Sequence, residues 1–452
     1  MSSVALVTLG CARNDVDSDE LAATLTAAGY DVTTDEAGAD VIMVNTCGFV
    51  AEAKQESIDT LLGSVTDGRP VIAVGCLAER YGKELAGELP EVDAVVGFDG
   101  YATMGETVAR VLAGERVESH TPVDRRTLLP VTPVARRARP PGHEPVLDLP
   151  GSRRTRLRRG PVAPVKIASG CDRRCAFCAI PRFRGSFVSR SPDEIVAEVA
   201  GLADEGVREV ILVSENSTSF GKDLGDPRAL DSLVSQVATL VDRVRVSYLQ
   251  PAEIRPTLIE AMVATPGVAP YFDLSFQHAS GPLLRRMRRF GDSESFLELI
   301  GTIRGRVPGA GIRSNVIVGF PGETDEDVAI LEDFLGCAEL DAVGVFGYSD
   351  EDGTEAEGLA DHVDPDEIVA RVDRVASLAE AVSAQRAADR IGTTATLLVE
   401  RTSREGSVGC CEFQGPDDGE TTLAGVDAEP GDLVDIVITD SDGIDLTGVV
   451  AP

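Results

Sequence analysis

A regular alternation of short apolar runs and helical segments between residues 161 and 384 is the feature that most constrains the fold. The runs are rich in β-branched and apolar residues, as buried parallel strands are, and longer helical segments separate them. Expected strands are Val162–Ala168, Val210–Ser214, Val244–Tyr248, Phe272–Phe276, Ile312–Val318 and Ala342–Tyr348, and expected helices are Pro192–Glu205, Pro227–Val241, Pro256–Ala264, Glu294–Arg306, Asp325–Cys337 and the closing Pro365–Ile391. The pattern predicts an open, partial version of the eight-fold βα barrel, with its chemistry at the carboxyl ends of the strands.

Residues 1–118 show the same alternation over a shorter stretch. Expected strands are Val4–Leu9, Val41–Asn45 and Val71–Gly75, and expected helices are Ser18–Ala28 and Ala51–Ser64. This order predicts a separate N-terminal domain, an α/β unit with a doubly wound parallel sheet.

Residues 119–160 interrupt both patterns and are predicted to form a linker or a long surface excursion. Between residues 119 and 161 the chain carries ten Arg against Asp124, Glu144 and Asp148. A basic strap that lies on acidic neighbours is the simplest interpretation, and a contact with RNA is the alternative.

Residues 385–452 are predicted to form a small all-β barrel after the central unit of residues 161–384. Expected strands, separated by Gly, Pro and Asp turns, are Thr394–Glu400, Ser407–Phe413, Thr421–Ala424, Leu433–Thr439 and Asp445–Val450. Such barrels often bind nucleic acid. The predicted barrel carries 14 Asp and Glu against 4 Arg, a net charge of −10, so we expect it to bind nucleic-acid phosphate poorly.

The composition excludes several classes of protein. With 452 residues, 43% of them hydrophobic, the chain can form several cores, which argues against wholesale disorder. It has no run of the roughly 18 apolar residues that a membrane span needs, and no secretion signal at its start. Nine cysteines then suit a reducing compartment and metal binding, so we expect a cytoplasmic protein. The formal charge of −33 repels nucleic-acid phosphate and attracts basic partners, although a solvated acidic surface also explains it.

Cys171, Cys175 and Cys178 form a C-x3-C-x2-C sequence directly after an expected strand. Three thiolates on one loop can bind three corners of a cubic iron–sulfur cluster, which leaves the fourth iron open to a small molecule. Structural zinc is the alternative, but it takes four ligands, and no His or fourth Cys lies nearby in the sequence. The spacing therefore predicts a 4Fe-4S cluster.

Cys11, Cys47 and Cys76 are far apart in the sequence, yet each follows an expected strand of the N-terminal sheet. Three adjacent parallel strands would bring these cysteines to one edge, where open α/β sheets bind ligands. The arrangement predicts a second three-cysteine cluster with an open iron. The alternative is three small buried apolar side chains, which is a common role for free cysteine.

Cys337, Cys410 and Cys411 have no comparable position. Cys337 ends an expected helix, and the other two lie within an expected strand of the C-terminal barrel. We assign them to packing.

The cysteine spacing at 171–178, with Phe177 before the third cysteine and the motif on the first loop of a βα barrel, resembles the radical S-adenosylmethionine superfamily. By that resemblance, the open iron chelates the amino and carboxylate groups of S-adenosylmethionine. The reduced cluster cleaves it to a 5′-deoxyadenosyl radical that abstracts hydrogen from an unactivated carbon. Such chemistry requires a dry, closed site.

The whole chain is similar to the methylthiotransferases of that superfamily. The matching pieces are Leu9-Gly10-Cys11 with Asn14 and Asp17-Ser18, Asn45-Thr46-Cys47-Gly48-Phe49, Gly75-Cys76, Cys171 to Pro181 with Arg184-Gly185 and Ser189-Arg190, and Val318-Gly319-Phe320-Pro321-Gly322-Glu323-Thr324. The closing barrel is similar to the TRAM domain. The resemblance implies two 4Fe-4S clusters and S-adenosylmethionine as cofactors, with Cys11, Cys47 and Cys76 binding the auxiliary cluster.

One branch of this family modifies an isopentenyl-adenosine in transfer RNA, and the other modifies the β-carbon of an aspartate in the twelfth small-subunit ribosomal protein. Residues 277–280, Gln-His-Ala-Ser, and residues 438–448 resemble the protein branch. The acidic barrel agrees, because it would attract a basic ribosomal protein and repel an anticodon stem. The resemblance implies this protein as substrate, free or within the ribosome, a reductant such as flavodoxin or ferredoxin, and no direct binding of transfer RNA. The basic residues 119–160 depart from both branches.

The implied reaction replaces C–H by C–S–CH3 and uses two molecules of S-adenosylmethionine, with the substrate held between two facing clusters. Expected contacts to the cofactor come from strand ends and a glycine-rich turn: Glu215, Asn216, Gln277, Asn315, Gly319 and Gly322. No catalytic residue is assigned beyond the cluster ligands. His278 and the arginines 285, 286, 288 and 289 either bind a substrate carboxylate or, as we favour, pair with the acidic surface.

Two other functions remain open at this stage: a radical enzyme that acts on transfer RNA, and a non-catalytic iron–sulfur electron carrier or sensor. The carrier predicts no formation of 5′-deoxyadenosine, which both enzymes require. A barrel of six βα units is hard to justify for a carrier alone.

Overall fold

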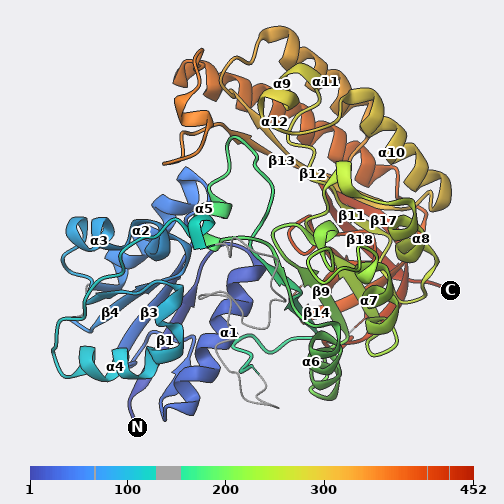
Figure 1. Ribbon diagram of the computed structural model, residues 1–452. Helices are drawn as coiled ribbons and strands as arrows, with labels where there is room; N and C mark the ends of the chain where they lie inside the picture. The colour runs from blue at the N-terminus through green and yellow to red at the C-terminus, as the bar shows by residue number, and fades with distance from the viewer. Residues whose placement is uncertain (66–67, 129–153, 405, 427) are drawn as a thin grey trace. The chain divides into compact units, whose positions relative to one another are not determined.

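The structure is a computed structural model that describes residues 1–65, 68–128, 154–404, 406–426 and 428–452. The chain forms two compact units, each described by itself below (Figure 1). The first unit comprises Met1–Arg159, Ser169–Arg173 and Ala179–Val188, and the second comprises Gly160–Ala168, Arg174–Cys178 and Ser189–Pro452. No helix in the described part of the chain is long and apolar enough to cross a membrane.

A parallel sheet forms the centre of the first unit, with strand order β2-β1-β3-β4-β5. The strands are β1 (Ser3–Thr8), β2 (Asp31–Thr33), β3 (Val41–Thr46), β4 (Val71–Val74) and β5 (Ala94–Val95). The helices are α1 (Ala12–Ala27), α2 (Ala51–Ser64), α3 (Gly75–Glu88) and α4 (Met104–Leu112), with short 3-10 helices η2 (Phe98–Thr103) and η3 (Arg125–Leu128). The doubly wound α/β domain predicted from the sequence is confirmed.

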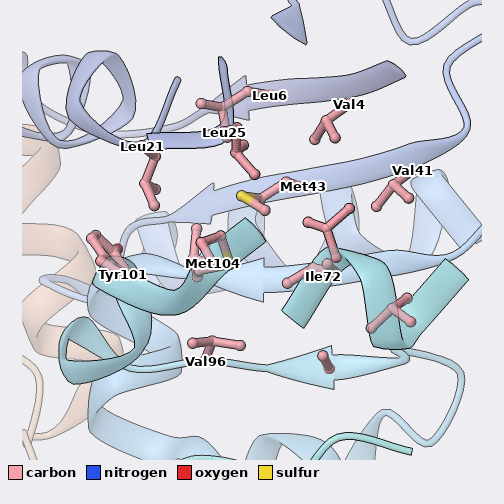
Figure 2. Packing of buried hydrophobic residues seen from close by; sticks show 14 of the residues in the cluster. Val4, Leu6, Leu21, Leu25, Val41, Met43, Ile72, Val96, Tyr101 and Met104 are labelled. Atoms are coloured by element: carbon pink, nitrogen blue, oxygen red, sulfur yellow. The ribbon is translucent and has the colours of Figure 1, made fainter. Parts of the chain in front are cut away.

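Both faces of this sheet are covered because successive side chains of a strand point in opposite directions. Met43 packs on one face with Leu21 and Leu25 of α1 and with Met104 of α4 (Figure 2). Its neighbour Ile42 packs on the other face, against α2 and α3. Burial of each such side chain contributes about 1.5–3 kcal/mol, so the two apolar layers fix the sheet and the ends of its strands.

Helix α1 begins at Ala12, whereas the sequence predicted a start at Ser18. The reason is that its first turns bury polar residues, namely Asn14, Asp17 and Ser18. Apolar periodicity does not detect such turns, since their side chains are held by hydrogen bonds and ion pairs rather than by hydrophobic burial.

The described parts of the basic segment 119–160 lie on acidic residues of the first unit. Arg125 is buried against Glu79, at 2.8 Å, and against Asp99, at 3.0 Å. Closer to the second unit in sequence, Arg154 lies 3.6 Å from Asp19. These contacts match the strap interpretation for the residues concerned. The arginines at 136, 137, 139 and 153 lie outside the described residues.

Parallel strands of two three-stranded sheets make up the barrel-like part of the second unit, in the orders β10-β9-β6 and β11-β12-β13. The strands are β6 (Val162–Lys166), β9 (Glu209–Val213), β10 (Arg243–Val246), β11 (Tyr271–Asp273), β12 (Gly311–Val318) and β13 (Ala342–Gly347). Single parallel bridges, Val244 to Val268 and Leu249 to Leu274, join the two sheets. The open, partial βα barrel is thereby confirmed.

Helices connect these strands along the chain. They are α6 (Pro192–Asp204), α7 (Ala229–Val237), α8 (Pro256–Ala264), α9 (Gly281–Arg286), α10 (Ser293–Arg306), α11 (Asp325–Ala338) and α12 (Pro365–Ala388), with η4 (Ser217–Ser219), η5 (Pro251–Glu253), η6 (Ala356–Gly358), and with β7 (Ala168–Ser169), α5 (Ile180–Arg184) and β8 (Val188–Ser189) near the cysteine motif. Prolines in the first turn of α6, α8 and α12 suit positions that need no backbone donor.

The C-terminal strands close into a small barrel with order β14-β15-β16-β18-β17. They are β14 (Thr394–Thr402), β15 (Ser407–Cys411), β16 (Thr421–Leu423), β17 (Leu433–Asp442) and β18 (Asp445–Val450). Each begins at the residue that the sequence predicted, and four of the five end one to three residues away from the predicted end. Leu397, Phe413 and Ile436 fill the interior.

A buried ionic cluster joins this barrel to the first residues of β9 and β10. Glu209 lies 2.5 Å from Arg243 and 2.7 Å from Arg245. The same guanidiniums donate to the barrel carbonyls of Cys410, at 2.9 Å, and Glu412, at 3.0 Å. The barrel is thus attached at the amino ends of these strands, opposite to the carboxyl ends where the cofactor contacts are expected.

Candidate metal centre

Cys11, Cys47 and Cys76 occupy equivalent positions in the first unit. Each is within three residues of the carboxyl end of its strand, β1, β3 or β4, and these strands are neighbours in the sheet. The sequence predicted this shared edge, and the strand order supports it.

Glycines next to the cysteines let the three loops approach closely. Gly10 has φ of +89°, and a Cβ there would lie 2.9 Å from Cβ and Sγ of Cys47. A Cβ on Gly48 would lie 3.1 Å from the carbonyl carbon of Cys76. Each cysteine loop therefore packs on the next one without room for a side chain.

Gly75 and two asparagines complete this packing. Gly75 has φ of +90°, and a Cβ would overlap the side chain of Asn45 and the backbone of Thr46. The Asn14 amide donates to the carbonyls of Leu9, at 2.8 Å, and Thr46, at 3.2 Å, while the Asn45 amide donates to the carbonyl of Asn14 at 3.0 Å. The conformation of the three strand ends is thus fixed by buried hydrogen bonds.

The thiols of this triad interact electrostatically. Burial raises the pKa of the Cys47 thiol to about 11, and negative charge at Cys76 and Cys11 adds to the rise. A buried thiol of this kind ionises when a metal binds it, because the metal replaces the proton. Metal binding at this triad would therefore release protons from its thiols.

A buried arginine provides positive charge at this edge. Arg184 of α5 donates to Cys76 Sγ at 3.0 Å and to Asp17 Oδ2 at 3.0 Å, and its guanidinium carbon lies 4.5 Å from the centre of the Phe98 ring. Burial disfavours its charge, but the charges of Cys76 and Asp17 outweigh burial and raise the pKa of Arg184. Arg184 was predicted only as part of a motif, since no local pattern links residues 108 positions apart.

The donor set is compatible with a cubic cluster. Within the described ranges, no three His, Cys, Asp or Glu side chains are grouped as ligands of one metal ion. In a cubic cluster each thiolate binds a different iron atom, so its sulfurs need not converge on one point. Three thiols at one sheet edge, with a cationic donor beside them, match that requirement.

The second cysteine motif has local support in each unit. In the first unit, the backbone N–H of Cys171 donates to the carbonyl of Gly185 at 3.1 Å. In the second, the N–H of Cys178 donates to the carbonyl of Cys175 at 3.2 Å, and Ala176 between them donates to the carbonyl of Met287 at 3.0 Å. The binding of a cluster by these three cysteines stays a prediction.

Arg289 lies beside this motif in the second unit. It is 5% exposed, lies 3.7 Å from Cys175 Sγ and donates to the carbonyl of Ser275. The sequence named this arginine only as one of a cluster. The contact of Arg289 with the Cys175 sulfur could not be predicted from the sequence.

The expected cofactor contacts lie at or near the carboxyl ends of the strands, as predicted. Glu215 and Asn216 follow β9, Gln277 follows β11, and Asn315 lies in β12. Asn216 is buried and accepts from the hydroxyl of Thr218 at 2.5 Å. Their role toward S-adenosylmethionine stays a prediction.

Asn315 and Gln277 belong to one stretch of backbone pairing. The N–H of Gln277 donates to the carbonyl of Asn315 at 2.9 Å, and Gln277 adopts a φ of +72°. The Asn315 amide oxygen accepts from Arg313 at 3.0 Å. These contacts fix the backbone of Gln277 against β12 and the side chain of Asn315 within that strand.

Gly319 and Gly322 both have φ of +82°, which explains glycine at these positions. The space next to them is occupied by the chain itself: a Cβ would meet Ile368 at Gly319 and the guanidinium of Arg286 at Gly322. Close packing against these side chains accounts for the glycines. Their expected approach to an adenosine stays a prediction.

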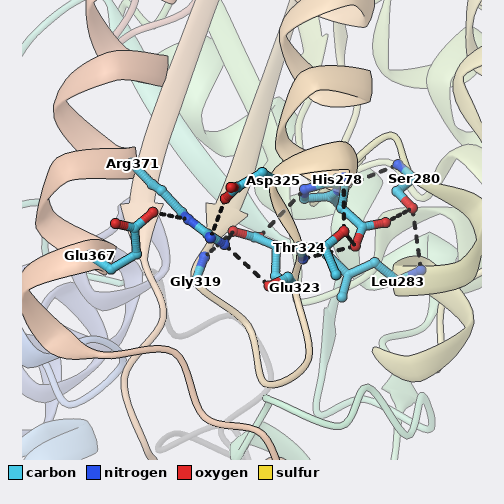
Figure 3. A network of polar contacts seen from close by, with 10 residues as sticks. His278, Ser280, Leu283, Gly319, Glu323, Thr324, Asp325, Glu367 and Arg371 are labelled. Atoms are coloured by element: carbon cyan, nitrogen blue, oxygen red, sulfur yellow. Dashed lines mark hydrogen bonds and ion pairs between the residues drawn. The ribbon is translucent and has the colours of Figure 1, made fainter.

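A buried polar network holds this glycine-rich turn (Figure 3). Glu323 accepts from the N–H of Gly319 at 2.8 Å and from Arg371 of α12 at 2.9 Å. His278, fully buried, accepts from the N–H of Ser280 at 3.0 Å through Nδ1, and its Nε2 lies 3.5 Å from Glu323. His278 therefore has a structural pairing, which the sequence analysis favoured.

Two arginines near His278 also pair with acidic side chains. Arg286 lies 3.6 Å from Asp361, and Arg288 lies 2.6 Å from Glu355.

Cys337 is exposed at the end of α11, whereas Cys410 and Cys411 are buried in β15, which agrees with packing for the buried pair. No metal-binding arrangement involves them within the described part of the chain.

Comparison with known families divides the chain into the same three parts. Residues 3–97 match the protein family UPF0004, residues 165–335 match the radical SAM superfamily, and residues 391–451 match the TRAM domain. Among solved structures, the radical S-adenosylmethionine methyltransferase TsrM from Kitasatospora setae is similar, with a TM-score of 0.52 at 17% identity. The match covers 77% of this chain and 72% of that one. At this identity the likeness supports the fold alone.

Similarity to curated proteins extends over nearly the whole chain. "Ribosomal protein uS12 methylthiotransferase RimO" of Saccharopolyspora erythraea is 58% identical, and the match covers 99% of this chain and 95% of that protein. The protein of the same name from Nocardioides sp. is 57% identical over 98% of this chain and 96% of its own length. Together with the three-part fold and the strand-end cysteines, this similarity shows that the chain belongs to the RimO family of radical SAM methylthiotransferases.

Proposed function

We propose that this protein adds a methylthio group to the β-carbon of an aspartate in ribosomal protein uS12, by radical S-adenosylmethionine chemistry. One observation carries the proposal. This protein is 58% identical to a uS12 methylthiotransferase, and its cysteines 11, 47 and 76 lie at one edge of the N-terminal sheet. It also carries the C-x3-C-x2-C motif. An enzyme that transfers a sulfur-containing group by radical chemistry has a use for both sets of thiols.

The proposal assigns two 4Fe-4S clusters. Cys171, Cys175 and Cys178 would hold one, and Cys11, Cys47 and Cys76 would hold the other. When bound, the first supplies reductive cleavage of S-adenosylmethionine, and the second supplies an open iron for the sulfur that is transferred.

The chain itself contributes binding, orientation and protection from water. Polar groups at the carboxyl ends of β9, β11 and β12, namely Glu215, Asn216, Gln277 and Asn315, would orient S-adenosylmethionine. The buried network of Glu323, His278 and Arg371 fixes the turn at Gly319 beside them. A pre-organised turn of this kind lowers the entropic cost of cofactor binding.

The C-terminal barrel supports a basic protein as the substrate. Its surface near β14, β16 and β18 includes a depression whose charged lining residues are one arginine, Arg401, and four acidic residues, Glu400, Asp417, Glu420 and Asp445. Phosphate would be repelled there, and an arginine- and lysine-rich ribosomal protein would be attracted in a salt-dependent way. The same charge weakens the alternative of a transfer-RNA methylthiotransferase, which the curated relatives also do not favour.

The remaining assignments concern the cellular setting. A small reductant such as flavodoxin or ferredoxin would supply the electron that reductive cleavage of S-adenosylmethionine requires. We place the enzyme in the cytoplasm, where uS12 is made and assembled.

Mass spectrometry of uS12 tests the function directly. Ribosomes from a strain that lacks this gene should carry uS12 lighter by about 46 Da than ribosomes from the parent, the mass of SCH3 replacing H. The gene should restore the mass, and a Cys47→Ala variant should not. Unchanged uS12, with loss of a methylthio group from transfer RNA instead, would favour the nucleic-acid branch.

A further inference from the structure

The side chain of Arg184 brings a positive charge next to the sulfur of Cys76, although the packing of the Cys76 loop does not depend on that charge. Arg184 is 8% exposed, and its guanidinium lies 3.0 Å from the Cys76 sulfur. The same guanidinium also contacts Asp17, at 3.0 Å, and the amide oxygen of Asn14, at 3.4 Å. The contact with the Cys76 sulfur is therefore made in addition to the ion pair with Asp17.

The geometry of Arg184 is rigid. Its planar guanidinium bonds Asp17 through one nitrogen and Cys76 through another, while its face lies on the Phe98 ring. A lysine carries its three donors on one nitrogen, so it does not reproduce the planar pair of nitrogens that here bonds Asp17 and Cys76 separately. The aspartate and the ring thus hold a cationic donor in a fixed position against one sulfur of the triad.

We propose that Arg184 is a positioning residue that donates a hydrogen bond to the Cys76 sulfur in the loaded protein and raises the reduction potential of the N-terminal cluster. The inference rests on the proposed function, which assigns a cluster to Cys11, Cys47 and Cys76. Reduction adds one electron to the cluster, and hydrogen bonds and positive charge near its sulfurs stabilise that more negative state. Asp17 serves by holding the guanidinium in place.

A chain with a single cluster makes the effect measurable. In full-length protein with Cys171, Cys175 and Cys178 all changed to Ala, only the N-terminal cluster can form. Iron per chain and an anaerobic redox titration followed by electron paramagnetic resonance then report on that cluster alone. Neither readout depends on activity.

The test compares Arg184→Met, which removes the charge and the donors, with Arg184→Lys, which keeps the charge but not both bonds. Arg289→Lys is the matched control, because Arg289 is another buried arginine near a cysteine sulfur, at the motif that has been removed. The midpoint potential should fall in the order parent, Arg184→Lys, Arg184→Met. At the parent midpoint, the ratio of reduced to oxidised cluster should drop at least tenfold in Arg184→Met, about 59 mV for one electron. Arg289→Lys should leave it unchanged.

The possible outcomes separate the inference from the function. If the triple-alanine parent binds no cluster, the two-cluster function fails, and the inference fails with it. If the parent binds a cluster and both Arg184 variants titrate at the parent potential, only the inference is overturned. Loss of iron from both variants, with a native circular dichroism spectrum, also overturns it, since Arg184 would then be needed for assembly of the site rather than for its potential.

Discussion

Glu209→Gln should destabilise the junction between β9, β10 and the C-terminal barrel. Glu209 is 3% exposed and binds two guanidiniums, at 2.5 Å from Arg243 and 2.7 Å from Arg245, whose own side chains are 5% and 1% exposed. The substitution leaves two buried positive charges without a carboxylate. Removal of one member of a buried ion pair costs about 3–5 kcal/mol, and we expect the loss to lie in that range.

The lowered pKa of Glu209 agrees with a stabilising role of its carboxylate at neutral pH. Burial alone would raise the pKa of this carboxyl, but the charges of Arg243 and Arg245 outweigh burial and hold it below the ordinary value. A carboxyl with a lowered pKa in the folded state stabilises the protein above its ordinary pKa, and the contribution is lost as the pH falls. The whole effect of the substitution should therefore be present at pH 7.

Hydrogen exchange of the barrel amides measures this loss where it occurs. Arg243 and Arg245 donate to the carbonyls of Cys410 and Glu412, so exchange in and after β15 should accelerate. A cost of 3–5 kcal/mol corresponds to roughly 10²–10⁴-fold faster exchange through local opening.

Glu420→Gln provides the matched control for this experiment. Glu420 pairs with Arg401 on the barrel surface, where both side chains are more than half exposed. Exposed pairs contribute about 0–1 kcal/mol, so the same chemical change should have little effect there. If the two variants accelerate exchange equally, the buried cluster does not fix the barrel and the reasoning is wrong.

Three further changes have defined outcomes. Gly75→Ala should lower the iron content of the N-terminal site, because its Cβ would overlap neighbouring residues at φ of +90°, whereas Gly87→Ala, with open space around its Cβ, should retain iron. Asp19 is buried, which raises its pKa to about 6, so the folded state binds its proton more tightly than the unfolded state does. The wild type should then lose up to about 3 kcal/mol relative to Asp19→Asn between pH 4 and pH 7, as measured by unfolding at each pH. Cys47→Ser should abolish one cluster by iron analysis, and Cys337→Ser, at an exposed helix end, should abolish none.

Several elements of this fold could be predicted from apolar burial, although helices α3 and α4 were missed. Helices α2 and α8 have the bounds that the sequence predicted, Ala51–Ser64 and Pro256–Ala264. Short edge strands were missed, because β2 has three residues and β5 has two, too few to show a period. The start of α1 was placed six residues late for a different reason, since its first turns are held by polar contacts.

The candidate site divides in the same way. The cysteines were predictable because each marks the end of an apolar strand, a position that the sequence shows directly. Arg184 and Arg289 were not, since each reaches a cysteine sulfur more than 100 residues away in the sequence. Such contacts depend on how α5 and the segment after α9 return to the sheets, which local patterns do not specify.

The glycines and asparagines next to the cysteines have structural roles in the motif. Gly10, Gly48 and Gly75 could be read as flexible loop residues, yet each one allows a backbone or cysteine contact that a Cβ would block. Asn14 and Asn45 bond the carbonyls of neighbouring loops rather than a ligand. Around the N-terminal triad, therefore, the glycines and asparagines of the motif specify how closely three strand ends can approach, whereas the cysteines and Arg184 present groups suited to a cluster. Substitution of the glycines should thus change the geometry of the site, and iron content measures that change. Substitution of Arg184 should change the charge next to the cluster, and the reduction potential measures that change.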